Sequence, residues 1–121
     1  MSDPSREVIL SNALVDVSIE GWRFLRAVEH ATSGLDAEQH RRTVSRCNYF
    51  RKKLTDTLTC LDLWFVTLDG TKYESGVAAS AINAEDFLGA EDLVVDQTIE
   101  PIVMGASGVV RPGTVTLRRA V

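Results

Sequence analysis

The spacing of the apolar residues changes once along this 121-residue chain, and that change most constrains the fold. Up to about residue 65, apolar side chains recur at steps of three and four, which is the spacing of one face of an α-helix. Near the end of the chain, Val115 and Leu117 alternate with polar residues, as they would in a half-buried strand. These two periods predict an α+β protein, with an antiparallel two-helix hairpin over residues 1–65 and a small β-rich domain over residues 66–121.

Two amphipathic helices account for the first half of the sequence. The first is expected to begin at Asp3 or Ser5 and to run to about Ala31. Its stripe is formed by Leu10, Leu14, Val17, Gly21, Phe24 and Val28, with Leu25 beside it. Gly21 costs about 1 kcal/mol relative to alanine inside a helix, so its place in the stripe indicates a closely approaching helix or a kink. The second helix is expected to begin near Asp36, and its stripe consists of Val44, Cys47, Phe50 or Arg51, Leu54, Leu58, Leu61 and Phe65.

The helices carry more apolar side chains than a two-helix contact can cover. The residues that flank the two stripes are Val15, Ile19, Trp22 and Tyr49. A second copy of the chain would cover this surplus, so the sequence predicts a homodimer built as a four-helix bundle. The side chains expected to form the dimer contact are Leu14, Val17, Trp22, Leu54 and Leu58.

Strand and turn signals follow the helices. Residues 64–68 have the composition of a strand, and Asp69-Gly70 is a turn signal. Two or three strands are expected after residue 92. The first covers residues 93–105, where Pro101 removes one ladder N–H group and predicts an edge strand or a bulge. The sequence Gly105-Ala106-Ser107-Gly108 predicts a hairpin turn before the final strand. The intervening residues are rich in glycine and acidic side chains and are expected to form a loop.

The residues that commonly carry chemistry form no recognisable catalytic or metal-binding pattern. His30 and His40 flank the interhelix loop, and a metal held there would need a further ligand such as Glu29 or Asp36, so two exposed histidines are the favoured interpretation. Only two cysteines are present, and they are interpreted as small apolar residues of a helix. The acidic pairs Glu85-Asp86 and Glu91-Asp92 lie in a polar loop. The sequence therefore predicts a non-enzymatic protein without a metal or a cofactor.

Charge and hydropathy limit the classes of partner. The net charge of −4 argues against nucleic acid as a partner, because binding to phosphates requires a basic face. The basic side chains that gather between positions 41 and 53 spread around one helix and are interpreted as a solvated face. No apolar run approaches the ~20 residues that cross a bilayer, and the N-terminus lacks the features of a secretory signal. The expected location is the cytoplasm, away from membranes.

Three segments of the second half together resemble a known family. A leucine-rich helix end leads into Gly70-Thr71-Lys72-Tyr73-Glu74, residues 93–105 end in glycine, and Val109-Val110-Arg111-Pro112-Gly113-Thr114-Val115 closes the chain. This order resembles the C-terminal part of GrpE-type nucleotide exchange factors, with their G-x-x-Phe/Tyr-Asp/Glu signature and closing Val-Leu-Arg-Pro-x-x-Val strand. The long N-terminal coiled-coil helix of the family has no counterpart, and Ser75-Gly76-Val77 stands where the family commonly has a histidine.

The resemblance implies a homodimer whose β domain is a wing that binds a DnaK-type chaperone. In the family, this wing opens the nucleotide-binding domain of the chaperone so that ADP leaves, which requires no catalytic side chain. The partner-binding residues that the resemblance implies are Glu100, Met104, Gly105, Arg111 and Val115. Arg111 is the expected charged anchor, although Arg111-Pro112 could instead only order the hairpin. The alternative function is an interaction or scaffolding subunit with a GrpE-like fold and no exchange activity.

Overall fold

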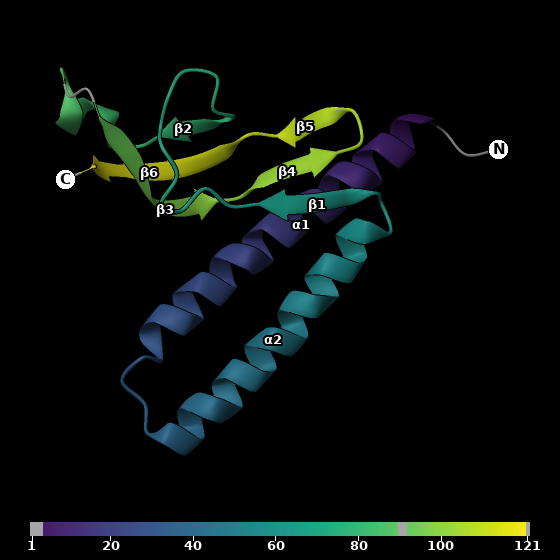
Figure 1. Ribbon diagram of the computed structural model, residues 1–121. Coiled ribbons are helices and arrows are strands. Elements are labelled where there is room, and N and C mark those ends of the chain that lie inside the picture. Colours follow the sequence, from purple (N-terminus) through teal and green to yellow (C-terminus); the bar gives the residue numbers. More distant parts are fainter. Residues whose placement is uncertain (1–3, 90–91, 121) are drawn as a thin grey trace. The chain divides into compact units, whose positions relative to one another are not determined.

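The computed structural model describes residues 4–89 and 92–120. The chain divides into two units, Met1–Asp62 and Leu63–Val121. Among the described residues, the first unit contains two long helices and the second contains six strands, so the predicted α+β class is confirmed (Figure 1). None of the helices described here is long and apolar enough to cross a membrane.

The helical unit consists of α1 (Pro4–Ala31) and α2 (Ala37–Thr59), which run side by side in opposite directions (Figure 1). The start of α2 is set by Asp36, whose side chain accepts a hydrogen bond of 2.9 Å from the backbone N–H of Gln39. This N-cap satisfies one of the donors that a helix leaves free in its first turn. At the end of α1, the hydroxyl of Thr32 donates to the carbonyl of Val28 at 2.7 Å. Local side chains therefore determine where the turn between the helices begins and ends.

The two helices approach each other closely at Gly21. A Cβ atom at this position would lie 3.0 Å from Cδ2 of Leu54 and 3.1 Å from Cε1 of Phe50. The predicted close approach of a neighbouring helix is therefore confirmed, and it explains why a residue with low helix propensity stands in the middle of α1.

The buried stripe of α1 is not the stripe predicted from the sequence. The buried residues of this helix are Val15, Ser18, Ile19, Trp22 and Leu25. Four members of the predicted stripe, Leu10, Leu14, Val17 and Phe24, are exposed instead. Both sets follow helical spacing, because apolar residues cover a wide arc of α1. Periodicity alone could not tell which part of this arc is buried.

The predicted continuation of α2 to Phe65 is wrong. The helix ends at Thr59, Asp62 adopts a left-handed conformation with φ of 57°, and Phe65 lies in strand β1 (Leu63–Val66). Few residues other than glycine adopt this conformation, but aspartate tolerates it better than most. The division between the units thus falls at Asp62, close to the expected position 65.

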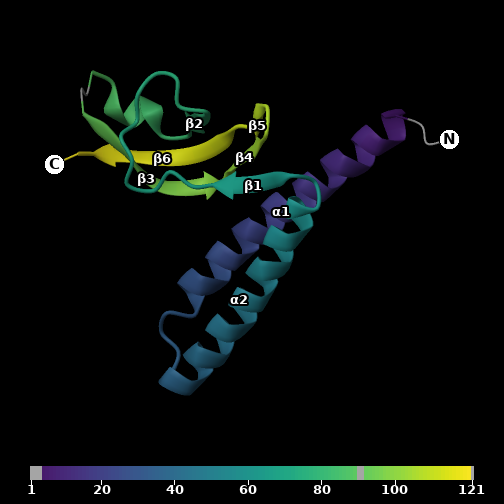
Figure 2. The same cartoon turned by 45° about the vertical axis from the view of Figure 1, so that its right-hand side comes forward.

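The β unit consists of two three-stranded sheets (Figures 1 and 2). The first sheet has the order β1-β4-β5, and the second has the order β2-β6-β3. The remaining elements are β2 (Ala79–Ala81), the 3-10 helix η1 (Ala84–Phe87), β3 (Leu93–Glu100), β4 (Ile102–Gly105), β5 (Gly108–Arg111) and β6 (Gly113–Arg119). All neighbouring strands are antiparallel except β2 and β6, which are parallel.

Prolines mark two of the three places where the chain passes from one sheet to the other; the passage from β1 to β2 has none. Pro101 separates β3 from β4, and Pro112 separates β5 from β6. A proline cannot donate to a strand ladder, so it fits where one ladder ends and another begins. Strand β3 is the last strand in the order of its sheet, and its pairing with β6 shifts in register between Thr98 and Glu100. The predicted edge position and the predicted bulge are therefore both observed. The predicted hairpin over Gly105–Gly108 is confirmed, but the single closing strand is in fact two strands in two sheets.

The second sheet carries its own small core. Val95, Val115 and Leu117 are buried together, and the half-buried side chains around them are Leu68, Tyr73, Ala79, Ala81, Phe87 and Leu93. The inward orientation predicted for Val115 and Leu117 is confirmed. Part of the segment that was expected to be a loop is ordered as β2 and η1, and Phe87 and two alanines from it complete this core.

Candidate partner-binding surface

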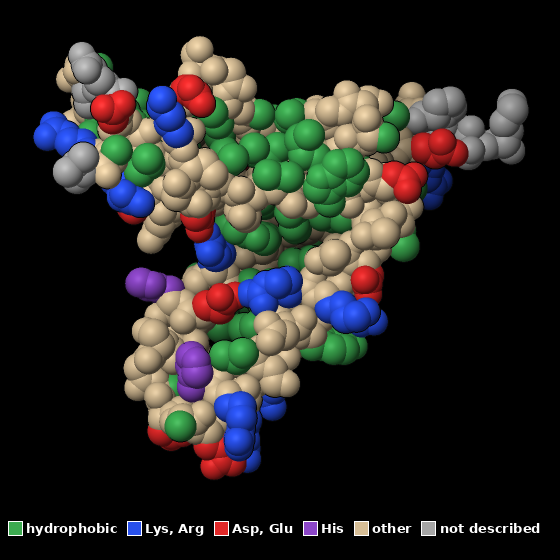
Figure 3. All heavy atoms as spheres, viewed as in Figure 1, with side chains coloured by type: hydrophobic (Ala, Val, Ile, Leu, Met, Phe, Trp, Pro, Cys, Tyr) green, Lys and Arg blue, Asp and Glu red, His purple; other side chains and the backbone are tan. Residues whose placement is uncertain are grey.

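A row of apolar side chains crosses one face of the β1-β4-β5 sheet. Trp64 pairs with Met104, and Met104 pairs with Val109, so the three side chains lie on the same face. Trp64 is 47% exposed and Val109 is 49% exposed, while Met104 is half-buried. Figure 3 shows hydrophobic side chains gathered over these three strands. Tryptophan and methionine are enriched in protein interfaces, so this row is a candidate contact surface.

Arg111, which the sequence identified as the charged anchor, belongs to the same sheet as the row but to its other face. The pairing of β4 with β5 shifts between Val103 and Met104, so that Arg111 stands opposite Val103 and Val110 is the additional residue on β5. Arg111 is half-buried and already takes part in an interaction within the protein. Residues that stand directly opposite one another share a face, so Arg111 lies on the face of the buried Val103 and not on the face of Met104. The bulge instead adds Val110, which is 45% exposed, next to Val109.

The other residues predicted to bind a partner are dispersed. Glu100 lies at the end of β3, in the other sheet, and its carboxylate accepts a hydrogen bond of 2.8 Å from the hydroxyl of Thr114. Gly105 is buried and pairs with Leu63 and Gly108 in the first sheet. Of these residues the structure therefore places Met104 in the apolar row, whereas Arg111 lies on the other face of that sheet and Glu100 belongs to a different ladder.

The assignment of Val115 to the partner-binding surface is wrong. This side chain is 0% exposed and belongs to the core of the second sheet, so a partner cannot reach it without unfolding of the β unit. The alternation along β6 requires this, because Val115 and Leu117 share the inward face while Thr116 between them faces the other way.

The five predicted dimer residues fall into two groups. Leu14 and Val17 are exposed, and they remain available for contact with a second copy. Trp22, Leu54 and Leu58 are buried within the single chain, so their assignment to a dimer surface is corrected: they stabilise the protomer. Leu54 packs against Gly21 on α1, and Leu58 is only 1% exposed.

The side chains considered for chemistry do not converge. The Nδ1 atom of His40 lies 3.5 Å from the carbonyl oxygen of Thr32. Both cysteines are free thiols, and Cys47 is buried while Cys60 is exposed. Glu85 lies in η1, and Glu91 falls outside the described residues. Within residues 4–89 and 92–120, no group of three or more His, Cys, Asp or Glu side chains could hold a metal ion.

Trp64, Val109 and Val110 are the surface residues that the sequence analysis did not assign to the site. The signal available was weak, because Trp64 stands in an apolar run and Val109-Val110 immediately precede Arg111. An apolar run does not show which of its members face solvent, since that depends on strand pairing. Only the register of three strands brings Trp64, Met104 and Val109 together.

Comparison of the chain with models of protein families, with curated proteins and with solved structures found no match in any of the three.

Proposed function

We propose that this chain is a non-enzymatic, co-chaperone-like protein that resembles GrpE-type factors and acts in the cytoplasm. It binds a DnaK-type chaperone through its β unit and promotes the release of ADP. The observation that carries this proposal is the row of Trp64, Met104 and Val109 on one face of the first sheet, in which Trp64 and Val109 are exposed. An exposed row that contains a tryptophan and a methionine has the composition of a protein-binding surface.

The proposed action requires only differential binding. A partner whose cleft opens and closes is shifted toward the open form by any protein that binds the open form more tightly. A shift from 1% to 99% open needs about 5.5 kcal/mol of preference, which a compact interface with a few buried anchors can supply. The side chains of the apolar row would provide such anchors without any proton transfer or covalent step.

The helical unit supports the dimer that belongs to this proposal. Leu10, Leu14, Val17 and Phe24 follow at helical steps along α1, and all four are exposed. Phe50 of α2, which packs beside Gly21, is 42% exposed and extends this apolar face. We propose that a second copy covers the face, giving a four-helix bundle.

An exchange assay tests the function. The full-length protein should accelerate the release of a fluorescent ADP analogue from a DnaK-type chaperone of the same source. Met104→Ala and Arg111→Ala should each reduce this acceleration, while Arg118→Ala is the matched control because Arg118 lies on the other sheet and pairs with Asp96. Circular dichroism and an unfolding curve must show that each variant is folded.

The outcomes separate the two candidate functions. Failure of the wild-type protein both to bind the chaperone and to accelerate release would refute the exchange function and leave the scaffolding subunit as the better interpretation. Loss of folding in Arg111→Ala alone would show that this arginine orders the hairpin. In that case the effect of Met104→Ala still decides whether the apolar row binds the partner.

The dimer is tested independently by multi-angle light scattering. Val17→Asp and Phe24→Asp should give the monomer mass with the helix content preserved. Ile9→Asp is the control, because Ile9 is equally exposed on α1 but projects from a different side of the helix. A monomer mass for the wild-type protein at micromolar concentration would refute the dimer.

A further inference from the structure

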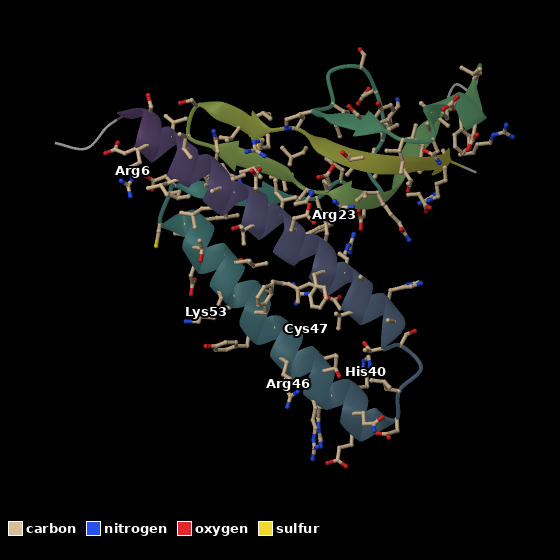
Figure 4. All side chains as sticks on the ribbon, turned by 180° about the vertical axis from the view of Figure 1, so that it is seen from behind. Arg6, Arg23, His40, Arg46, Cys47 and Lys53 are labelled. Atoms are coloured by element: carbon tan, nitrogen blue, oxygen red, sulfur yellow. The ribbon has the colours of Figure 1, made fainter. Side chains whose placement is uncertain are left out.

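A second surface of the chain is a basic stripe on α2, formed by Arg42, Arg46, Tyr49 and Lys53. These residues follow one another at steps of four, three and four, so they lie along a single face of the helix. All four are exposed, and Tyr49 is 66% exposed. Figure 4 shows Arg46 and Lys53 extending from the side of α2 away from α1, whereas Cys47 points toward α1.

The charges of the basic stripe are largely uncompensated. Arg42 pairs with Glu38 at 3.0 Å, but both side chains are well exposed, and an ion pair of this kind contributes only about 0.5 kcal/mol. Lys53 lies over the ring of Tyr49, with Nζ 5.6 Å from the ring centre. Arg46 has no ion-pair partner within the described part of the chain. An open hollow of about 380 Å³ beside these residues is lined by Arg41, Arg42, Ser45 and Arg46.

The stripe stands out against the charge of the whole protein. Helix α2 contains six arginines and lysines but only two acidic residues, a net charge of +4, whereas the full chain carries −4. A local concentration of one sign on a protein of the opposite sign marks a surface for a complementary partner. Arginine and tyrosine are the residues that most often dominate protein interfaces, and Tyr49 stands in the middle of the stripe.

Acidic residues close the stripe at both ends, and this limits the kind of anion that fits. Glu38 lies one turn before Arg42, and Asp56 lies one turn after Lys52, with which it pairs at 3.0 Å. The part of α2 from Arg42 to Lys53 therefore spans only about 16 Å, because an α-helix rises 1.5 Å per residue. A nucleic acid strand that continued along α2 would bring phosphates against Glu38 and Asp56. A short acidic segment, by contrast, would end where the stripe ends.

We propose that the basic stripe binds a short acidic helix of a protein partner. The carboxylates of this helix would recur at steps of three and four over about three turns, which matches the spacing of Arg42, Arg46 and Lys53. The aliphatic part of the partner helix would cover the ring of Tyr49. This inference does not rest on exchange activity, and the stripe is separate from the apolar row of the β unit.

Fluorescence anisotropy with a designed probe tests the proposal. The probe is a labelled helical peptide of about 20 residues, long enough to span the stripe, with glutamates at steps of three and four on one face. A second peptide has the same composition with the glutamates distributed around the helix. The full-length protein should bind the first peptide more tightly than the second, and binding should weaken between ~50 and ~300 mM salt because the contacts are exposed.

Charge-neutral variants locate the contact. The double variant Arg42→Gln, Arg46→Gln should weaken binding of the probe at least about tenfold, which corresponds to about 1.4 kcal/mol. Tyr49→Ala should weaken it without changing its salt dependence, since tyrosine carries no charge. Arg23→Gln is the control, because Arg23 lies on α1 and pairs with Glu20. Circular dichroism should show the same helix content in all variants.

Three results would overturn the inference. The first is failure of the probe to bind at ~50 mM salt, where screening is weak. The second is equal binding of the probe by the Arg42 and Arg46 double variant and by Arg23→Gln. The third is tighter binding of a duplex of about 20 base pairs than of the peptide, with loss of that affinity in the same double variant, which would make the stripe a phosphate-binding surface.

Discussion

Replacing Gly113 by alanine should destabilise the β unit severely. A Cβ atom at this position would lie 2.7 Å from the backbone carbonyl oxygen of Glu100 and 3.1 Å from Cγ1 of Ile102. Carbon and oxygen atoms that are not bonded normally approach no closer than about 3.3 Å, so the two segments would have to separate by roughly 0.5 Å. The obstacle is backbone, and it immediately precedes Pro101, whose ring restricts local adjustment.

The magnitude follows from the cost of overpacking. Adding a methyl group to a well-packed site costs about 1–3 kcal/mol, and the upper part of this range is expected here because no side chain can rotate out of the way. With a urea dependence of about 1–3 kcal/mol per molar, a loss of about 3 kcal/mol lowers the unfolding midpoint by about 1 M or more. The strand pairing of Gly113 with Ala79 and its N–H bond of 2.9 Å to the carbonyl of Ala78 would be weakened at the same time.

Tryptophan fluorescence can follow the two units separately. Trp22 lies in α1 and Trp64 lies in β1, so each unit has one tryptophan. In a Trp22→Phe background, urea unfolding monitored by fluorescence reports on the β unit. Because parent and variant share the background substitution, their difference in unfolding free energy isolates the effect of Gly113→Ala.

Gly21→Ala is the matched control. A Cβ atom there would also be crowded, at 3.0–3.2 Å, but its neighbours are the ends of the Leu54 and Phe50 side chains, which can move. Alanine also gains about 1 kcal/mol in helix propensity, so the net change in unfolding free energy should stay within about 1 kcal/mol of zero. If Gly113→Ala changed the Trp64-monitored midpoint no more than Gly21→Ala changes that of Trp22, the close approach at Gly113 would be refuted.

Three further substitutions test hydrogen bonds that order the chain, each by urea unfolding monitored through the tryptophan of the unit concerned. Asn83→Ala should cost about 2–3 kcal/mol of unfolding free energy, because the side-chain amide accepts a hydrogen bond of 2.8 Å from the N–H of Leu117 and donates one of 3.0 Å to its carbonyl. An unchanged urea midpoint would show that these two hydrogen bonds do not stabilise the β unit. Thr98→Val keeps the shape but removes the acceptor for the N–H of Leu68 at 3.0 Å, and it should cost about 1–3 kcal/mol. Asp36→Ala removes the N-cap of α2 and should cost about 1 kcal/mol, whereas Asp36→Asn should retain most of the stability.

Local chemistry made several elements predictable. Asp36 caps α2 because a short acceptor at that position satisfies a free N–H group, whatever the rest of the fold is. Pro101 interrupts a ladder because it has no N–H to donate. The turn at Asp69-Gly70 is also local, with Gly70 at φ of 79°, where glycine is favoured. Such features act over a few residues, so the sequence around them is sufficient to predict them.

The candidate site was only partly predictable, because its members come from strands far apart in the sequence. Met104 was identified through the resemblance of its segment to a family motif, whereas Arg111, chosen in the same way, lies on the other face of the sheet. Trp64 was not, because its neighbours on the sheet are determined by the pairing of β1 with β4. Val115 was misassigned because a sequence motif does not distinguish a residue that contacts a partner from one that fills the core beneath it.

The sequence by itself determined that helices precede strands, where α2 begins, and which residues of β6 point inward. Those properties depend on the period of apolar residues and on short-range capping and turn chemistry. The tertiary structure alone decided which part of the apolar arc of α1 is buried, and that β5 and β6 belong to different sheets although only Pro112 separates them. Burial and strand pairing are set by neighbours distant in sequence, so no local pattern of residues encodes them.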